Sequence, residues 1–457
     1  MSTTITAEEE ILLKRALDDA RDTRILEAAG GARYETARTF RALFGDRSAI
    51  VVADGRTFDA AGSDVHHALQ HAGVACDSPF LFGPDVYAEY CYVEALQAAL
   101  GETPAIPVAV GSGTINDLTK LVAHRLDRPY MVVATAASMD GYTAYGASIT
   151  YRGSKQTFDC PAPSGVLADL DVIAHAPLGM NASGYADLLA KGVAGADWLL
   201  ADAAGEEAVE PAVWDTVQRF LPGWVGSPTG IARSEPECLR QLVTGLMMSG
   251  FAMQAARTSR PASGAEHQFS HLWDMQHHIH EGAAPTHGFK VGIGTLASLD
   301  LYEVLLRRDL DRLDVEATVA AWPSLAEEET RIVALFGPGE LAEKALVETR
   351  AKHPSVETLR AQIELLQDGW PALRERLTRH LEPFRNARAM LAAAGCPSEP
   401  EQIGISRERL RRSYEQAYCI RRRYTVLDFA KRLGLFDVSL VELFGTKPPA
   451  APGGIRP

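Results

Sequence analysis

Short runs of β-branched residues alternate with stretches of helical period through the first 175 residues. SAIVVAD, PAIPVAVG, PYMVVAT and SGVLADLDVIA, which begin at residues 48, 104, 129 and 164, are rich in Val and predict buried strands. Between them, AEYCYVEALQAAL and NDLTKLVAHRL carry apolar residues at a spacing of three to four, which predicts helices. This alternation is typical of a doubly wound parallel sheet. The first 45 residues, in contrast, have only the helical period and predict helices.

The pattern changes beyond residue 176, where the strand-like runs end and the helical period continues to about residue 445. We therefore expect an α/β fold with two domains. A parallel-sheet α/β domain would cover residues 1–175, and an all-helical domain would cover residues 176–445. The Pro/Gly-rich tail, residues 446–457, has the composition of a disordered segment.

Composition and charge exclude several classes of protein. The chain has 457 residues, of which 46% are hydrophobic and 23% charged, as in a soluble globular protein. A formal net charge of −14 argues against a non-specific nucleic-acid binder, which needs a basic surface, but does not exclude an anionic small-molecule substrate, for which a pocket needs only a few cations. The acidic N-terminus does not resemble a signal peptide, and no apolar run reaches the ~20 residues that span a bilayer. Six scattered cysteines are typical of reduced thiols, so we expect a cytoplasmic protein.

A glycine turn follows the strand predicted near residue 106. VAVGSGTINDLTK, residues 108–120, runs from a strand through Gly111 and Gly113 into a helix, a geometry whose free N–H groups favour a pyrophosphate. The next strand leads into VVATAASMDGYTAYGAS, residues 132–148, where hydroxyl groups and Asp140 could bond to a ribose or a substrate. A tight capped turn that binds nothing is the alternative for each stretch.

Six of the 13 histidines lie in residues 264–290, GAEHQFSHLWDMQHHIHEGAAPTHGFK. His267 and His271 are four apart and would share one helix face, whereas His287 would begin a new helix. One aspartate and two histidines form a common ligand set for Zn²⁺, Fe²⁺ or Ni²⁺. Asp187, in an Ala/Leu-rich helix, is a candidate for the aspartate, although a surface pair with Lys191 explains it equally well. The other three histidines are expected to be solvated.

Two further patterns carry little information. Tyr151 and Lys155 have the YxxxK spacing of short-chain reductases, but the glycine fingerprint of those enzymes is missing, so we attribute the spacing to chance. The basic run at residues 405–424 predicts one amphipathic helix whose arginines pair with acidic neighbours or a second subunit. A nucleic-acid-binding regulator is the other interpretation of this run, and it conflicts with the net charge.

The motifs GSGTINDLTK, ATAASMDGY, SRPASGAEHQFSH and THGFKVGIGTL, in this order, resemble those of the sn-glycerol-1-phosphate dehydrogenases, most closely the bacterial branch. That family lies within the superfamily of iron-containing alcohol dehydrogenases and dehydroquinate synthases, and the resemblance covers roughly residues 48–300. It implies the dehydroquinate synthase-like fold, with a nucleotide-binding first domain and a second domain that binds metal and substrate. The sequence departs from the family at Phe289, where relatives often have a carboxylate, and at Ala144, where some have a serine.

The resemblance also implies roles for individual residues. The metal ligands, which are also the catalytic residues, would be Asp187, His267 and His287. The substrate would contact Asp140, Asp187 and His271. The coenzyme pyrophosphate would bind Gly113, Thr114, Ile115, Asn116 and Asp117. A second coenzyme contact would come from Thr135, Ala136, Ala137 and Ser138, and Asp54 would reach the adenosine ribose.

The activity that the resemblance implies is the reversible reduction of dihydroxyacetone phosphate to sn-glycerol 1-phosphate by NADH or NADPH with one divalent metal. The sequence leaves open the metal (Zn²⁺, Ni²⁺ or Fe²⁺) and the choice between NAD and NADP. A homodimer is the expected assembly. The alternatives are a dehydroquinate synthase-like cyclase, a glycerol or polyol dehydrogenase, and a non-catalytic relative. Arg260 and Lys290 are candidates for the phosphate-binding cations, and the region after residue 300 is assigned no chemistry.

Overall fold

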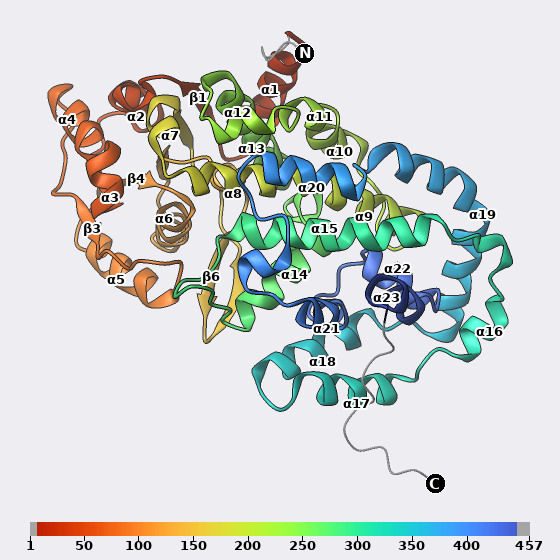
Figure 1. The fold of residues 1–457 in the computed structure, drawn as a ribbon. Helices are drawn as coiled ribbons and strands as arrows, with labels where there is room; N and C mark the ends of the chain where they lie inside the picture. Colours follow the sequence, from red (N-terminus) through yellow and green to blue (C-terminus); the bar gives the residue numbers. More distant parts are fainter. Residues whose placement is uncertain (1–6, 446–457) are drawn as a thin grey trace.

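A six-stranded parallel sheet forms the first half of the protein in a computed structural model, which describes residues 7–445 (Figure 1). The strands of the structure are β1 (Ile25–Ala29), β2 (Ala49–Asp54), β3 (Phe80–Phe82), β4 (Ile106–Gly111), β5 (Met131–Ala134), β6 (Ala147–Tyr151), β7 (Ser154–Phe158) and β8 (Gly165–Asp169). Their order in the sheet is β1-β8-β5-β4-β2-β3, and β6 and β7 form a separate antiparallel hairpin. The four strands predicted from Val-rich runs are β2, β4, β5 and β8, so the predicted parallel sheet is confirmed.

Helices cover both faces of the sheet. The α-helices of residues 7–125 are α1 (Ala7–Asp19), α2 (Thr36–Phe44), α3 (Gly55–Thr57), α4 (Ser63–His71), α5 (Tyr90–Gly101) and α6 (Gly113–Arg125). Alternate residues of β2 point to opposite faces, so that Val51 packs in the cluster with α2 and α4 and Val52 in the cluster with α5 and α6. Burial on both faces explains why the central strands are continuous apolar runs.

The prediction that the first 45 residues are helical is wrong at residues 25–29. Ile25–Ala29 forms the edge strand β1, which pairs in parallel with β8. All of its residues are only partly buried, and Glu27 interrupts the apolar sequence, so no strand pattern is visible. The hairpin of β6 and β7 was also not predicted. It places Tyr151 and Lys155 on two antiparallel strands rather than on one helix face, as expected for a chance YxxxK.

Helices alone follow β8 in the described part of the chain, as predicted, apart from one isolated bridge. They are α7 (Leu170–His175), α8 (Leu178–Leu189), α9 (Lys191–Ala203), α10 (Pro211–Gln218), α11 (Leu221–Trp224), α12 (Pro228–Ala232), α13 (Pro236–Ala256), α14 (Ala265–Met275), α15 (His287–Leu306), α16 (Val315–Ala320), α17 (Leu325–Phe336), α18 (Glu340–Lys352), α19 (Val356–His380), α20 (Phe384–Ala393), α21 (Arg407–Cys419), α22 (Val426–Arg432) and α23 (Phe436–Phe444). The basic run therefore contains a helix that ends at Cys419, before its last three arginines.

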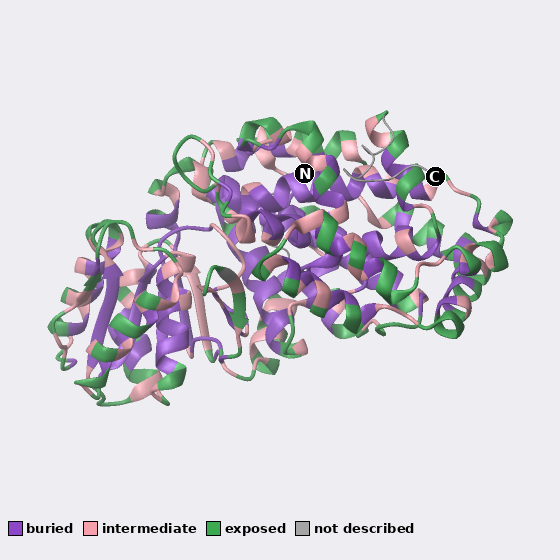
Figure 2. Ribbon diagram, turned by 90° about the horizontal axis from the view of Figure 1, so that it is seen from below, coloured by how far each residue is buried: buried purple, intermediate pink, exposed green. Residues whose placement is uncertain are grey.

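One hydrophobic cluster extends from the sheet through the helical half. It includes Val132 of β5, Leu188 of α8 and Leu427 of α22, and Figure 2 shows buried residues continuing between the two parts. Division into domains at residue 175 therefore stays a prediction. The predicted disordered tail, residues 446–457, lies outside the described residues. Within residues 7–445, no helix has the length and apolar character needed to cross a membrane.

A close contact between α8 and the loop after β5 gives a test of this packing. A Cβ atom added to Gly184 would lie 1.8 Å from the Ala137 carbonyl oxygen, so the backbone would have to move. We expect Gly184→Ala to lower the free energy of unfolding by about 2 to 3 kcal/mol in urea denaturation. Gly192→Ala is the matched control, because its added Cβ would lie 3.8 Å from Leu221. Equal stability of the two variants would contradict this packing.

Candidate metal and coenzyme site

Asp187, His267 and His287, the three predicted metal ligands, come together from α8, α14 and α15. One ligand atom from each side chain can be chosen so that all three lie within 4.8 Å of one another. The Asp187 Oδ1 atom lies 3.6 Å from His267 Nε2, and the rings of His267 and His287 are 5.3 Å apart. Close helix packing makes this possible, since a Cβ atom on Gly288 would lie 1.8 Å from the backbone oxygen of Ser183 in α8.

The Asp187 carboxylate is completely buried and paired with a buried lysine. Lys191 Nζ lies 2.7 Å from Asp187 Oδ1 and 2.8 Å from Asp140 Oδ2, and its side chain is also fully buried. Burial alone would raise the pKa of Asp187, but the Lys191 ammonium and the His267 ring hold it well below its usual range. The sequence left open whether Asp187 is a buried site residue or the partner of Lys191. In the structure it is both.

Each histidine of the site has a different environment. His267 Nδ1 lies 2.7 Å from the Glu266 carboxylate, which makes Nδ1 the donor and leaves Nε2 facing Asp187. Burial lowers the pKa of His287 to about 3, and its buried Nδ1 has no hydrogen-bond partner in the described part of the chain. Burial also lowers the pKa of His271 well below its usual value. His271 lies outside the three-residue cluster, its ring 6.0 Å from that of His267.

A cavity of about 310 Å³ connects the histidines to the glycine turn. Predicted site residues that line it are Gly113, Thr114, Asp117, Ser138, Asp140, His267, His271 and His287. A second cavity of about 520 Å³ is lined by Asp54 and Thr135. The two cavities share Ser112, Thr114 and Met180, so together they form an extended groove along the carboxyl ends of β2, β4 and β5. Parallel sheets bind dinucleotides at this edge.

Four of the predicted coenzyme residues line neither cavity. The four residues are buried in the protein and do not reach either cavity: Ile115, Asn116, Ala136 and Ala137. Asn116 instead holds the wall in place, since its Nδ2 donates to the Gly141 carbonyl and its Oδ1 accepts from the Tyr130 hydroxyl.

The loop that carries Asp140 is anchored by Lys120, whose role the sequence did not indicate. The buried Lys120 ammonium donates to the carbonyl groups of Gly141, Ala144 and Gly146 at 2.9 to 3.0 Å. Local sequence identifies this lysine only as a member of α6, because its three acceptors lie more than 20 positions away.

Replacing Lys120 by methionine would remove its hydrogen bonds to these three carbonyl groups, and among the described residues only the Gly141 carbonyl would keep a side-chain donor, Asn116 Nδ2. We expect Lys120→Met to lower the free energy of unfolding by about 2 to 4 kcal/mol and to weaken coenzyme binding about tenfold, because the loop loses its anchor. Urea denaturation and a fluorescence titration with NADH measure the two effects. Arg125→Met, at the exposed end of the same helix, is the control. Unchanged coenzyme affinity in Lys120→Met would contradict the anchoring role.

The candidate phosphate cations, Arg260 and Lys290, do not line the cavity. Arg260 is buried and donates to the backbone carbonyl groups of Tyr424 and Asp197, and Lys290 is paired with Asp274. The cations on the cavity wall are Lys155 and Arg421. Arg421 belongs to the region to which the sequence assigned no chemistry.

The two departures from the family differ in position. Ala144 lines the cavity, whereas Phe289 does not and packs partly buried against the main hydrophobic cluster.

Comparisons with known proteins agree with this arrangement. The sequence profile of the iron-containing alcohol dehydrogenases matches residues 28–177. The chain is 31% identical over 388 residues to the NAD(P)+ glycerol-1-phosphate dehydrogenase of Geobacillus thermodenitrificans, which covers 83% of this chain and 86% of that protein. It is 34% identical over 263 residues to the enzyme of the same name from Bacillus subtilis, covering 57% of this chain and 67% of that protein.

Solved structures share the fold at low sequence identity. Glycerol dehydrogenase from Schizosaccharomyces pombe superposes with a TM-score of 0.56 at 16% identity and covers 93% of this chain and 94% of that one. Sulfoacetaldehyde reductase from Bifidobacterium kashiwanohense, solved with NAD+, superposes with a TM-score of 0.54 at 14% identity and covers 93% of this chain and 98% of that one.

Proposed function

The chain belongs to the glycerol-1-phosphate dehydrogenase family, and from this premise we propose that it interconverts dihydroxyacetone phosphate and sn-glycerol 1-phosphate with NAD(P) and a divalent metal. The observation that carries the proposal is the cluster of Asp187, His267 and His287, of which the two histidines line a cavity that continues to a glycine turn. A metal-assisted hydride transfer needs the metal and the coenzyme to be within reach of the same substrate.

The residues of the cluster fit a divalent cation. A carboxylate and two imidazoles are a usual ligand set, and the depressed pKa of His287 keeps its ring neutral, the form that binds metals. The Glu266 carboxylate orients His267 as an outer partner would. The metal would polarise the ketone of the substrate as a Lewis acid, while NAD(P)H would supply the hydride.

The chain itself would bind and orient the substrate. Asp140 is held at the cavity wall by the Lys191 ammonium and by the Ser249 hydroxyl, which donates to it at 2.7 Å. An acceptor fixed in this way can orient a substrate hydroxyl. His271, kept neutral by burial, can donate or accept a hydrogen bond next to it. Apolar side chains such as Met180 and Met253 restrict water on the wall of the cavity.

The test is the loss of NADH or NADPH absorbance with dihydroxyacetone phosphate, using metal-stripped protein to which Zn²⁺, Ni²⁺ or Fe²⁺ is returned separately. Metal-dependent oxidation would support the proposal and identify the metal and the preferred coenzyme. Oxidation with glycerol-type substrates alone would indicate a polyol dehydrogenase. Turnover of a substrate without net NADH loss would indicate a cyclase, and binding without turnover a non-catalytic relative. A homodimer, a cytoplasmic location and the absence of nucleic-acid partners stay predictions.

A further inference from the structure

Arg421 forms one end of the active-site cavity although it lies more than 130 positions after His287. It belongs to the segment between α21 and α22, and it lines the cavity with His267 and His271. Lys155 of β7 lines the same cavity. Both cations also line an adjoining polar cavity of about 710 Å³. The two cavities therefore meet at Lys155 and Arg421.

Arg421 forms no direct ion pair with a carboxylate among the described residues, although Glu348 and Glu266 attract its charge from a greater distance. Its guanidinium is 3.1 Å from the Ser263 hydroxyl and 3.4 Å from the Ser259 hydroxyl, and within residues 7–445 no carboxylate oxygen lies within 4.0 Å of it. Burial lowers the pKa of Arg421, so a nearby anion would stabilise its charged form. A partly buried guanidinium that contacts only hydroxyl groups still has donors for an anionic ligand.

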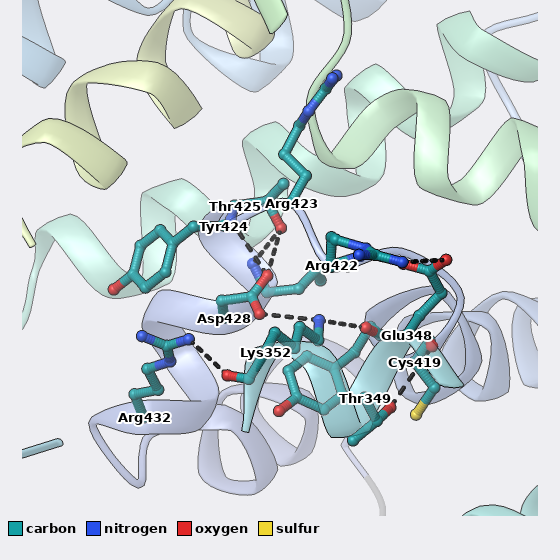
Figure 3. Close-up of polar contacts among 12 residues, drawn as sticks. Glu348, Thr349, Lys352, Cys419, Arg422, Arg423, Tyr424, Thr425, Asp428 and Arg432 are labelled. Atoms are coloured by element: carbon teal, nitrogen blue, oxygen red, sulfur yellow. Dashed lines mark hydrogen bonds and ion pairs between the residues drawn. The ribbon is translucent and has the colours of Figure 1, made fainter. Parts of the chain in front are cut away.

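The surrounding segment is rigidly held by other residues (Figure 3). Arg422 donates to the Glu348 carboxylate at 2.9 Å. Asp428 caps the start of α22 through Thr425 and is 2.8 Å from the Lys352 ammonium. Each of these neighbouring charges has a partner within the protein. These contacts hold the segment in place, and none of them uses the Arg421 guanidinium.

We propose that Arg421 and Lys155 bind the phosphate group of the substrate, an inference that rests on the proposed function. They line the cavity with the histidines and the adjoining polar cavity, and neither lines the cavity with Asp54, which is expected for the adenosine. The coenzyme pyrophosphate is accounted for by the glycine turn at Gly113. A phosphate monoester suits the planar fork of an arginine, which donates two parallel hydrogen bonds to its oxygens.

The first test compares a phosphorylated substrate with its unphosphorylated analogue. In the metal-loaded enzyme, we expect Arg421→Gln to raise KM for dihydroxyacetone phosphate roughly 10- to 100-fold, since a charge-assisted hydrogen bond is lost. The kcat/KM for dihydroxyacetone should change less than about threefold, because that ketone makes no phosphate contact. Arg421→Lys should lie between wild type and Arg421→Gln. Arg412→Gln, on the exposed face of α21, is the control. Equal losses for both ketones would overturn the proposal.

A second test does not depend on turnover. Inorganic phosphate should raise the thermal unfolding midpoint of the wild-type protein, and Arg421→Gln and Lys155→Met should each lose most of this increase. Lys155 is a partly exposed residue of the β6–β7 hairpin, so its replacement keeps the test valid if Arg421→Gln folds poorly. Phosphate stabilisation that persists unchanged in both variants would refute the assignment. Phosphate binding in a protein that does not oxidise NADH would refute only the proposed reaction.

Discussion

Asp187→Asn is expected to reduce turnover by at least ~10³-fold, since the metal contributes several kcal/mol to stabilisation of the transition state. Asparagine keeps the size of the side chain but removes the negative charge that faces His267 Nε2. The fold should survive, because Lys191 keeps its contact with Asp140 at 2.8 Å. NADH oxidation with dihydroxyacetone phosphate measures the turnover. The metal content after dialysis against a limiting metal concentration measures how much metal the variant retains.

Asp215→Asn provides the control for that experiment, as Asp215 is an exposed residue of α10 far from the site. It should keep both turnover and metal. Full turnover of Asp187→Asn would remove this aspartate from the catalytic machinery. A metal-loaded but inactive Asp187→Asn would instead separate binding of the metal from its catalytic function.

Lys191→Met is expected to lower the free energy of unfolding of the metal-free protein by about 3 to 5 kcal/mol, because it leaves two carboxylates buried without their cation. Those carboxylates belong to Asp140 and Asp187, which lie on either side of the Lys191 ammonium. A divalent metal can replace part of the missing positive charge. Metal addition should therefore stabilise Lys191→Met more than it stabilises the wild-type protein, and urea denaturation with and without metal measures the difference.

The control here is Lys14→Met, at an exposed position of α1, which should leave the stability unchanged. If Lys191→Met unfolded within about 1 kcal/mol of the wild-type protein, the buried charge cluster would contribute little to folding. Equal metal stabilisation of Lys191→Met and wild type would mean that the lysine and the cation do not compete for the same carboxylates.

Short local patterns were sufficient to predict those parts of the candidate site whose residues are close together in the sequence. The glycine turn before α6 and the paired positions of His267 and His271 on α14 are visible in short motifs. Asp187 was ambiguous, because periodicity places it on a helix but does not show whether that helix face is buried. Its exposure of 0% settles the burial, which depends on the packing of α8 against α13 and α15.

The sequence by itself determined the parallel sheet, because the central strands are buried on both faces and each leaves a continuous apolar run. It also pointed to His267 and His287 as predicted ligands through the motifs that contain them, whereas Asp187 stayed ambiguous. Only the tertiary structure revealed the long-range contacts of Lys120, Lys191 and Arg421. Arginine and lysine are usually exposed, and the burial of these three depends on oxygen atoms that distant segments bring to them, as Asp140 does for Lys191. The edge strand Ile25–Ala29 was hidden for a related reason, since only its pairing with β8 identifies it as a strand.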